Sequence, residues 1–184
     1  MNFAKTILAA TAISAGSAAS ALPVQFAGNG HWYEVVETQE THFGAFLGAM
    51  SLGGYLVTIT DAAEQAFIES TFGNAARYWT GGNDMAVEGD FEWIDGPEAG
   101  NPFTYTNWRN GAPQSNYAGQ DHVFLEDGTG EWVDVNGNNG NHVYAYLVEY
   151  TSYIPPVPVP AGLPLAAGAL GLLAFAKRRK NKKA

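Results

Sequence analysis

Large apolar residues recur at three- and four-residue spacing in one early segment of the chain, residues 40–52. The residues in this pattern are Phe43, Phe46, Leu47 and Met50. Such spacing is typical of one face of an α-helix, and the glycines at positions 53 and 54 supply the backbone freedom that often ends a helix. The pattern therefore predicts a first helix here.

A second helix is predicted after a short β-branched run at residues 55–59. Asp61 and Glu64 have the spacing of a capping box, in which two side chains satisfy free N–H groups of the first helical turn. We expect this helix to end at Gly73. Its apolar side chains are Phe67, Ile68 and Phe72.

The rest of the central region alternates strand patterns with stretches rich in Gly, Asn, Asp and Pro. Strands are predicted near residues 32–33 and at residues 77–80, 91–94, 122–126, 131–135 and 143–150. The last is apolar on both alternating faces, which favours a central, buried strand. A long polar region lies between about residues 96 and 121, and loops of this length in a compact domain are usually functional. Two early helices among several strands predict an α+β fold.

Charge is distributed unevenly along the chain. All eighteen acidic residues fall within residues 22–160, where only Arg77 and Arg109 are basic, so this region has a formal charge of −16. Such a surface repels nucleic acid and anionic lipid, and it favours divalent cations or neutral ligands. The chain has no cysteine, so packing or a bound metal must supply the stability that disulfides give many exported domains.

Residues 1–21 have the pattern of a secretory signal peptide. Lys5 is followed by a short apolar run and then by Ala19-Ser-Ala21, after which cleavage is expected. A membrane anchor is the alternative, but the apolar core is too short to cross a hydrocarbon layer of about 30 Å as a helix. The protein is therefore predicted to be exported.

The C-terminal region divides into three parts. Residues 151–161 form a proline-rich spacer, residues 162–176 form an uncharged stretch expected to be a short hydrophobic helix, and residues 177–184 form a basic tail. A basic cluster after an apolar stretch is expected to stay in the cytoplasm. Together, the segment Val157-Pro-Val-Pro-Ala161, the apolar stretch and the basic tail resemble the PEP-CTERM class of bacterial sorting signals, in the Val-Pro-x-Pro-Ala variant.

This resemblance implies an exosortase-type membrane enzyme as a processing partner and cleavage near the Pro-Ala pair. The mature protein would be released or attached at the cell surface after transient membrane association. A permanent C-terminal membrane anchor is the alternative interpretation of the same residues.

An ordered set of short motifs runs through residues 30–150. The motifs include Leu52-Gly-Gly-Tyr-Leu-Val-Thr-Ile59, Trp79-Thr-Gly-Gly-Asn-Asp84, Tyr105-Thr-Asn-Trp108, Gly111-Ala-Pro113, Trp132-Val-Asp134 and Tyr146-Leu-Val-Glu-Tyr150. In this order the set resembles the C-type-lectin-like domain, which we assign to residues 22–150. The resemblance implies two helices, two small antiparallel sheets and a long loop that holds calcium and ligand, with a cis proline at Pro113.

The resemblance also implies an auxiliary calcium site at Asp84, Glu88 and Asp121. Calcium takes about six to eight oxygen ligands, many of them carboxylates on loops. Ser115 replaces a further family aspartate, so this site has lost one ligand. The alternative is that Asp84 and Glu88 cap a turn and face solvent.

The family's principal sugar-binding calcium site departs from its usual pattern. Ala112 and Val133 stand where the family has oxygen ligands, and neither side chain can bind calcium. Sugar held through calcium in the usual geometry is therefore not expected. The residues predicted to contact a ligand are Gln114, Asn116, Tyr117, Gln120 and Asp134.

No pattern of catalytic residues accompanies these motifs. The four histidines show no zinc spacing, and Trp79, Trp93, Trp108 and Trp132 match core positions of the family. The resulting hypothesis is an exported, non-enzymatic binding protein that recognises carbohydrate or a protein partner at the bacterial cell surface or matrix. The alternative is a structural or adhesive surface protein without sugar binding.

Overall fold

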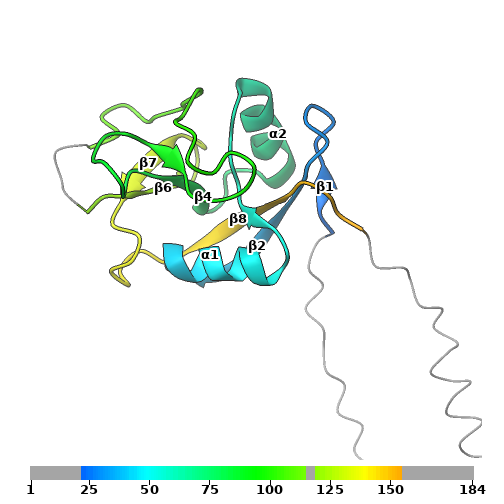
Figure 1. Cartoon of the computed structure of the whole chain (residues 1–184), viewed down its shortest axis with the longest axis horizontal. Coiled ribbons are helices and arrows are strands. Elements are labelled where there is room, and N and C mark those ends of the chain that lie inside the picture. The colour runs from blue at the N-terminus through cyan, green and yellow to red at the C-terminus, as the bar shows by residue number, and fades with distance from the viewer. Residues whose placement is uncertain (1–21, 115–118, 155–184) are drawn as a thin grey trace, which may run out of the picture. The chain divides into compact units, whose positions relative to one another are not determined.

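The structure, a computed structural model, describes residues 22–114 and 119–154 (Figure 1). The predicted signal peptide, the sorting region from residue 155 onward, and the loop residues Asn116 and Tyr117 lie outside the described residues. Neither helix in the described part of the chain is long and apolar enough to cross a membrane.

Two helices and eight strands make up the described domain. In chain order they are β1 (Val24–Gln25), β2 (Trp32–Glu40), α1 (His42–Ser51), β3 (Tyr55–Leu56), α2 (Ala62–Phe72), β4 (Tyr78–Asn83), β5 (Glu92–Trp93), β6 (His122–Leu125), β7 (Trp132–Val135) and β8 (Tyr144–Tyr150). Both predicted helices are confirmed. The β-branched run at residues 55–59 contributes only its first two residues to a strand, and β1 has no counterpart among the predicted strands.

The strands form one mixed sheet with the order β1-β2-β8-β4-β6-β7, while β3 pairs with β8 and β5 pairs with β4. All pairings are antiparallel except that of β4 with β8, where Tyr78 lies opposite Ala145 and Trp79 opposite Tyr146. This short parallel contact joins what the sequence predicted as two separate antiparallel sheets. The expected α+β fold with two helices is otherwise confirmed.

Strand β8 lies at the centre of this sheet and is covered on both faces, as its apolar pattern predicted. Ala145 and Leu147 pack into one core cluster, which also holds Ile68 of α2. Tyr146 and Val148 belong to the other cluster, on the side of α1. Figure 1 shows the two helices on opposite sides of the β2–β8 pair.

Helix α1 turns its large apolar side chains outward, which corrects the simplest interpretation of its pattern. Phe43, Leu47 and Met50 are 58%, 48% and 54% exposed, whereas Ala45 and Ala49 are fully buried. The facing sheet surface already holds the large rings of Trp79 and Tyr146, so the alanines of the helix pack closely against it. The buried His42 ring and the partly buried Phe46 ring join them on this face. A Cβ atom on Gly48 would lie 2.2 Å from the Tyr146 hydroxyl.

The start of α2 uses the two predicted capping residues in a modified way. The Asp61 carboxylate accepts hydrogen bonds from the N–H groups of Ala63 and Glu64, at 2.8 and 2.9 Å. The Glu64 carboxylate accepts from the Thr60 N–H at 2.8 Å and not from Asp61. Because Glu64 is buried, its carboxylate also reaches the core of the domain.

Candidate functional site

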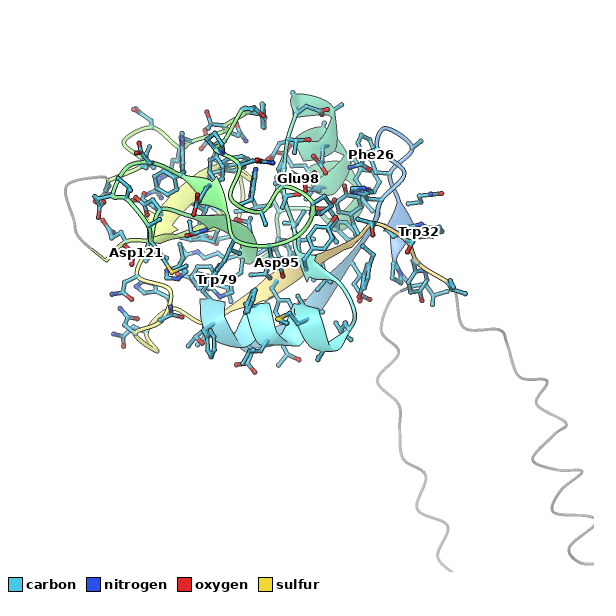
Figure 2. The ribbon with its side chains drawn as sticks, in the orientation of Figure 1. Phe26, Trp32, Trp79, Asp95, Glu98 and Asp121 are labelled. Carbon is cyan, nitrogen blue, oxygen red and sulfur yellow. The ribbon has the colours of Figure 1, made fainter. Side chains whose placement is uncertain are left out.

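Three acidic residues meet where β4, β6 and β7 end beside the long loop. Asp84 directly follows β4, Asp121 directly precedes β6, and the Asp84 N–H donates to the Asp121 carbonyl at 3.2 Å. Asp134 of β7 lies opposite Val123 of β6. Figure 2 shows Asp121 at the end of the domain that lies away from Trp32 and β1.

Asp84 is held in a defined orientation by the turn after it. It is only 2% exposed, and its Oδ2 atom accepts a hydrogen bond from the Gly89 N–H at 2.8 Å. Its Oδ1 atom is buried and has no hydrogen-bond partner among the described residues. Burial, and then the negative charges of Asp121 and Asp134, raise the pKa of Asp84. The alternative in which this carboxylate faces solvent is therefore wrong for Asp84.

Two more buried oxygen atoms near the loop lack a hydrogen-bond donor in the part of the chain that the structure describes. The Oδ2 atom of Asp134 accepts from the Gln114 N–H at 2.7 Å, but its Oδ1 atom has no partner. The Oε1 atom of Gln120 is also buried and unpaired. A buried acceptor without a donor is costly, so these oxygens are the ones that a bound cation or a ligand hydroxyl would satisfy.

Glu88 differs from the other predicted metal ligands because its side chain is exposed. Desolvation, and then repulsion from Asp84, Asp121 and Asp134, raise the pKa of Glu88, so the four carboxylates share one region of negative potential. Among the described residues, however, no group of three His, Cys, Asp or Glu side chains is arranged to hold a metal ion. The predicted trio is thus brought to one region but not into a closed cluster.

The predicted ligand-contacting residues are described only in part. Gln114 and Asp134 are joined by the hydrogen bond above, and Gln120 lies next to Asp121. The peptide bond between Ala112 and Pro113 is cis, as the resemblance implied. Asn116 and Tyr117, outside the described residues, stay predictions.

A network of buried carboxylates, which the sequence did not predict, lies on the α2 side of the sheet. The Tyr33 hydroxyl donates to Glu64 at 2.5 Å and also lies 3.2 Å from Glu149. Glu149 further accepts from the Thr58 N–H at 2.9 Å and contacts the His31 imidazole at 2.6 Å. Burial raises the pKa of Glu149. The only sequence signal was acidic residues inside otherwise apolar segments.

A pair of buried imidazoles lies on the opposite side of the same sheet. The rings of His42 and His122 are 4.2 Å apart, and the Nε2 atom of His42 is 3.0 Å from the Thr80 carbonyl oxygen. Burial, and then the charge of His122, lower the pKa of His42 to about 3. The sequence did not predict this pair, because His42 and His122 are far apart along the chain and show no metal-binding spacing.

Three of the four tryptophans assigned to the core are fully enclosed. Trp79, Trp93 and Trp132 are at most 3% exposed, which confirms their structural role. Trp108 is only half-buried, and its ring lies at the surface of the long loop region. It is therefore the described tryptophan in this set that a ligand could touch.

Comparison with known families identifies the region that holds this site. Residues 45–144 match the family model of the lectin C-type domain. The match includes both helices in whole or in large part, the long loop and every acidic residue discussed for the metal site.

Individual relatives agree with the family match. Halomucin of Haloquadratum walsbyi is 34% identical over 141 residues, which is 66% of this chain but 1% of halomucin. The carbohydrate-recognition domain of the mouse scavenger receptor C-type lectin has a TM-score of 0.62 and 24% identity, covering 73% of this chain and 97% of that one. The corresponding domain of cow CD23, solved in the presence of a GlcNAc2Man3 oligosaccharide, has a TM-score of 0.56 and 26% identity, covering 67% and 90%.

Proposed function

Because this chain belongs to the lectin C-type domain family, whose members are binding proteins and not enzymes, we propose that it is an exported protein that binds glycan through its long loop. The observation that carries this proposal is the set of buried oxygens on Asp84, Gln120 and Asp134 beside that loop, which have no hydrogen-bond partner within residues 22–114 and 119–154. Hydroxyl groups of a sugar, or a bound cation, would supply the missing partners.

The family relatives support glycan as the ligand class. The cow CD23 domain was solved in the presence of an oligosaccharide, and among the described residues of this chain the buried, unpaired oxygens lie on Gln120 of the long loop and on Asp84 and Asp134 beside it. Gln114 and Gln120 offer amide groups that can both donate to and accept from sugar hydroxyls. We assign ligand contact to the five residues predicted from the sequence, Gln114, Asn116, Tyr117, Gln120 and Asp134.

Calcium fits the chemistry of this region. The buried, unpaired atoms of Asp84, Gln120 and Asp134 are all oxygens, and hard oxygen donors suit calcium. Burial, and then repulsion from neighbouring carboxylates that include Asp121, raises the pKa of both Asp84 and Glu88, and a divalent cation would relieve that repulsion. We therefore propose that Asp84, Glu88 and Asp121 bind calcium, which would brace the loop, while the loop residues orient the ligand.

Calcium binding to the full chain should be measurable by isothermal titration calorimetry. We expect saturable binding, and we expect Asp84→Asn to weaken it about tenfold or more, because a buried anionic ligand would become neutral. Asp127→Asn is the matched control, since Asp127 is exposed and pairs with Arg77. On a glycan array with calcium present, the wild-type chain should bind selected glycans, and Gln114→Ala with Gln120→Ala should lose that signal.

The two measurements separate the proposed function from its alternative. A chain that titrates calcium but binds no arrayed glycan would be the structural or adhesive surface protein, in which calcium only braces the loop. Calcium affinity unchanged in Asp84→Asn would contradict the assignment of the metal site. Protein partners are the second ligand class, and specific binding of a protein by a chain that binds no arrayed glycan would support them instead of the structural role.

We further propose that the protein is sorted to the bacterial cell surface by its C-terminal region. The proposal rests on the PEP-CTERM-like segment 157–161, the apolar stretch 162–176 and the basic tail 177–184. Processing by an exosortase-type enzyme should remove the tail, so intact-mass spectrometry of the exported protein should show a chain that ends near Ala161. A mature protein that still carries Lys177 would be permanently anchored instead.

A further inference from the structure

An open cleft of about 440 Å³ lies between β5 and the long loop region. It is lined by Gly89, Asp90, Phe91, Glu92, Pro102, Phe103, Thr106, Trp108 and Pro113. This volume is within the usual range for small-ligand sites, which is roughly 300–1,000 Å³. None of the proposed calcium ligands, Asp84, Glu88 and Asp121, lines the cleft, and of the cis Ala112–Pro113 pair only Pro113 does.

One wall of the cleft is an aromatic surface. The Phe91 ring contacts Trp108 with centroids 4.8 Å apart, and Phe103 lies 6.2 Å from Trp108. Phe91 is buried, whereas Phe103 and Trp108 are half-buried and keep part of their rings accessible. Aromatic faces of this kind stack on the apolar faces of ligands and attract cations.

The aromatic wall is held in place by backbone hydrogen bonds. The Arg109 N–H donates to the Trp132 carbonyl at 3.0 Å, and the Trp132 N–H donates to the Asn107 carbonyl at 2.8 Å. On the other side, the Phe103 N–H donates to the Phe91 carbonyl at 3.1 Å. The residues that carry the rings are thus fixed before any ligand arrives, which lowers the entropy cost of binding.

Two carboxylates without partners complete the cleft. Asp90 is exposed and Glu92 is half-buried, and within the described residues neither side chain forms a hydrogen bond or an ion pair. None of the described residues that line the cleft has a basic side chain. Its charge is therefore uncompensated, in a region of the chain that already has a formal charge of −16.

We propose that this cleft binds a protonated amino sugar, whose ring packs on Trp108 and Phe103 and whose ammonium group is bound by Asp90 and Glu92. An apolar wall beside unpaired carboxylates selects a ligand that has both an apolar face and a positive charge. The requirement for a cation rests on the cleft alone. The choice of a sugar as the carrier of that charge rests on the proposed glycan-binding function.

The experiment compares a glucosamine oligomer with its N-acetylated counterpart, by calorimetric titration of the full chain in the presence of a calcium chelator. Acetylation removes the positive charge and keeps the sugar ring. We expect the glucosamine oligomer to bind about tenfold or more tightly than the acetylated one, because a charge-assisted hydrogen bond contributes more than a neutral one. Added salt should weaken the binding of the charged glucosamine oligomer and leave the binding of the acetylated oligomer unchanged.

Charge-neutralising variants locate the binding site. Asp90→Asn with Glu92→Gln should weaken binding of the glucosamine oligomer about tenfold or more. Glu37→Gln with Glu131→Gln is the matched control, because it changes the net charge equally at two carboxylates that do not line the cleft. Equal affinity for both oligomers, or equal weakening by both double variants, would overturn the proposal.

The titration is independent of the long-loop assignment. It contains chelator and leaves Gln114, Gln120 and the calcium residues unchanged, so failure of the calcium-dependent function would not remove the signal. Conversely, binding of the amine that disappears with chelator would belong to the calcium site and would contradict a separate cleft.

Discussion

Replacing Trp132 with alanine is expected to destabilise the domain by about 3–5 kcal/mol, the usual cost of removing a large buried aromatic side chain. Trp132 is 1% exposed, and its ring makes edge contacts with Trp93, Phe103 and Trp108 at 5.3–6.0 Å. Its indole N–H donates to the buried side chain of Gln65 at 2.8 Å. The variant would therefore leave both a cavity and an unpaired amide oxygen.

Urea denaturation of the full chain, followed by tryptophan fluorescence, measures this loss of unfolding free energy. Trp32→Ala is the matched control, because the same side chain is removed at a half-buried position near Tyr153. The control should cost clearly less than Trp132→Ala. Similar losses of unfolding free energy in the two variants would contradict the prediction that the buried Trp132 contributes more to stability than the half-buried Trp32.

Acidification is expected to destabilise the protein through His42. The pKa of this buried imidazole is lowered to about 3 in the folded state, against an ordinary value of 6.5. Its contribution is fully present above pH 6.5 and is lost as the pH falls toward 3, because the unfolded chain binds the proton first. Between pH 7 and pH 5 the protein is expected to lose about 2 kcal/mol of unfolding free energy through His42.

Other groups change this pH dependence in both directions. The pKa of His122 is also lowered by burial, so His122 adds to the acid sensitivity. The raised pKa values of Asp84 and Glu149 act the opposite way, because their contribution is present at low pH and is lost as the pH rises through the folded pKa. A comparison of wild type with a His42 variant therefore isolates the contribution of His42.

Thermal or urea unfolding at pH 7 and pH 5 should be compared for wild type and His42→Gln. Glutamine keeps an N–H donor for the Thr80 carbonyl but does not titrate. On acidification from pH 7 to pH 5, the variant should therefore lose about 2 kcal/mol less unfolding free energy than wild type. His142→Gln, at a half-buried imidazole near the surface, is the control and should retain the wild-type slope. Identical slopes for wild type and His42→Gln would contradict the prediction.

Much of the fold could be predicted because local sequence patterns decide it. Alternation and spacing located α1, α2 and β8 nearly to the residue, and Gly73 ends α2 in a backbone conformation with a φ of 72°. The orientation of α1 could not be obtained in this way. Which face is buried depends on the volume that Trp79 and Tyr146 already occupy on the sheet, and that is a tertiary property.

The sequence predicted Asp84, Glu88 and Asp121 as metal ligands and Asp134 as a ligand contact, and these roles stay predictions. The β4–β6–β7 pairing brings Asp84, Asp121 and Asp134 to one end of the sheet, an arrangement that motif order alone does not specify. That Asp84 is buried while Glu88 is exposed depends on the turn between them, which no spacing rule specifies. The aromatic cleft was likewise missed, because Asp90 and Trp108 become neighbours of one cavity only through the fold.

The long antiparallel pairing of β2 with β8 has a consequence for how this domain is used as a building block. Trp32 lies opposite Tyr150, and its ring contacts Tyr153 at 5.5 Å, so the polypeptide enters and leaves the domain at neighbouring points (Figure 1). A unit with adjacent ends can be inserted into a loop of another protein without forcing the flanking segments apart. Insertion of this domain into an exposed loop of an unrelated carrier protein should therefore preserve both folds.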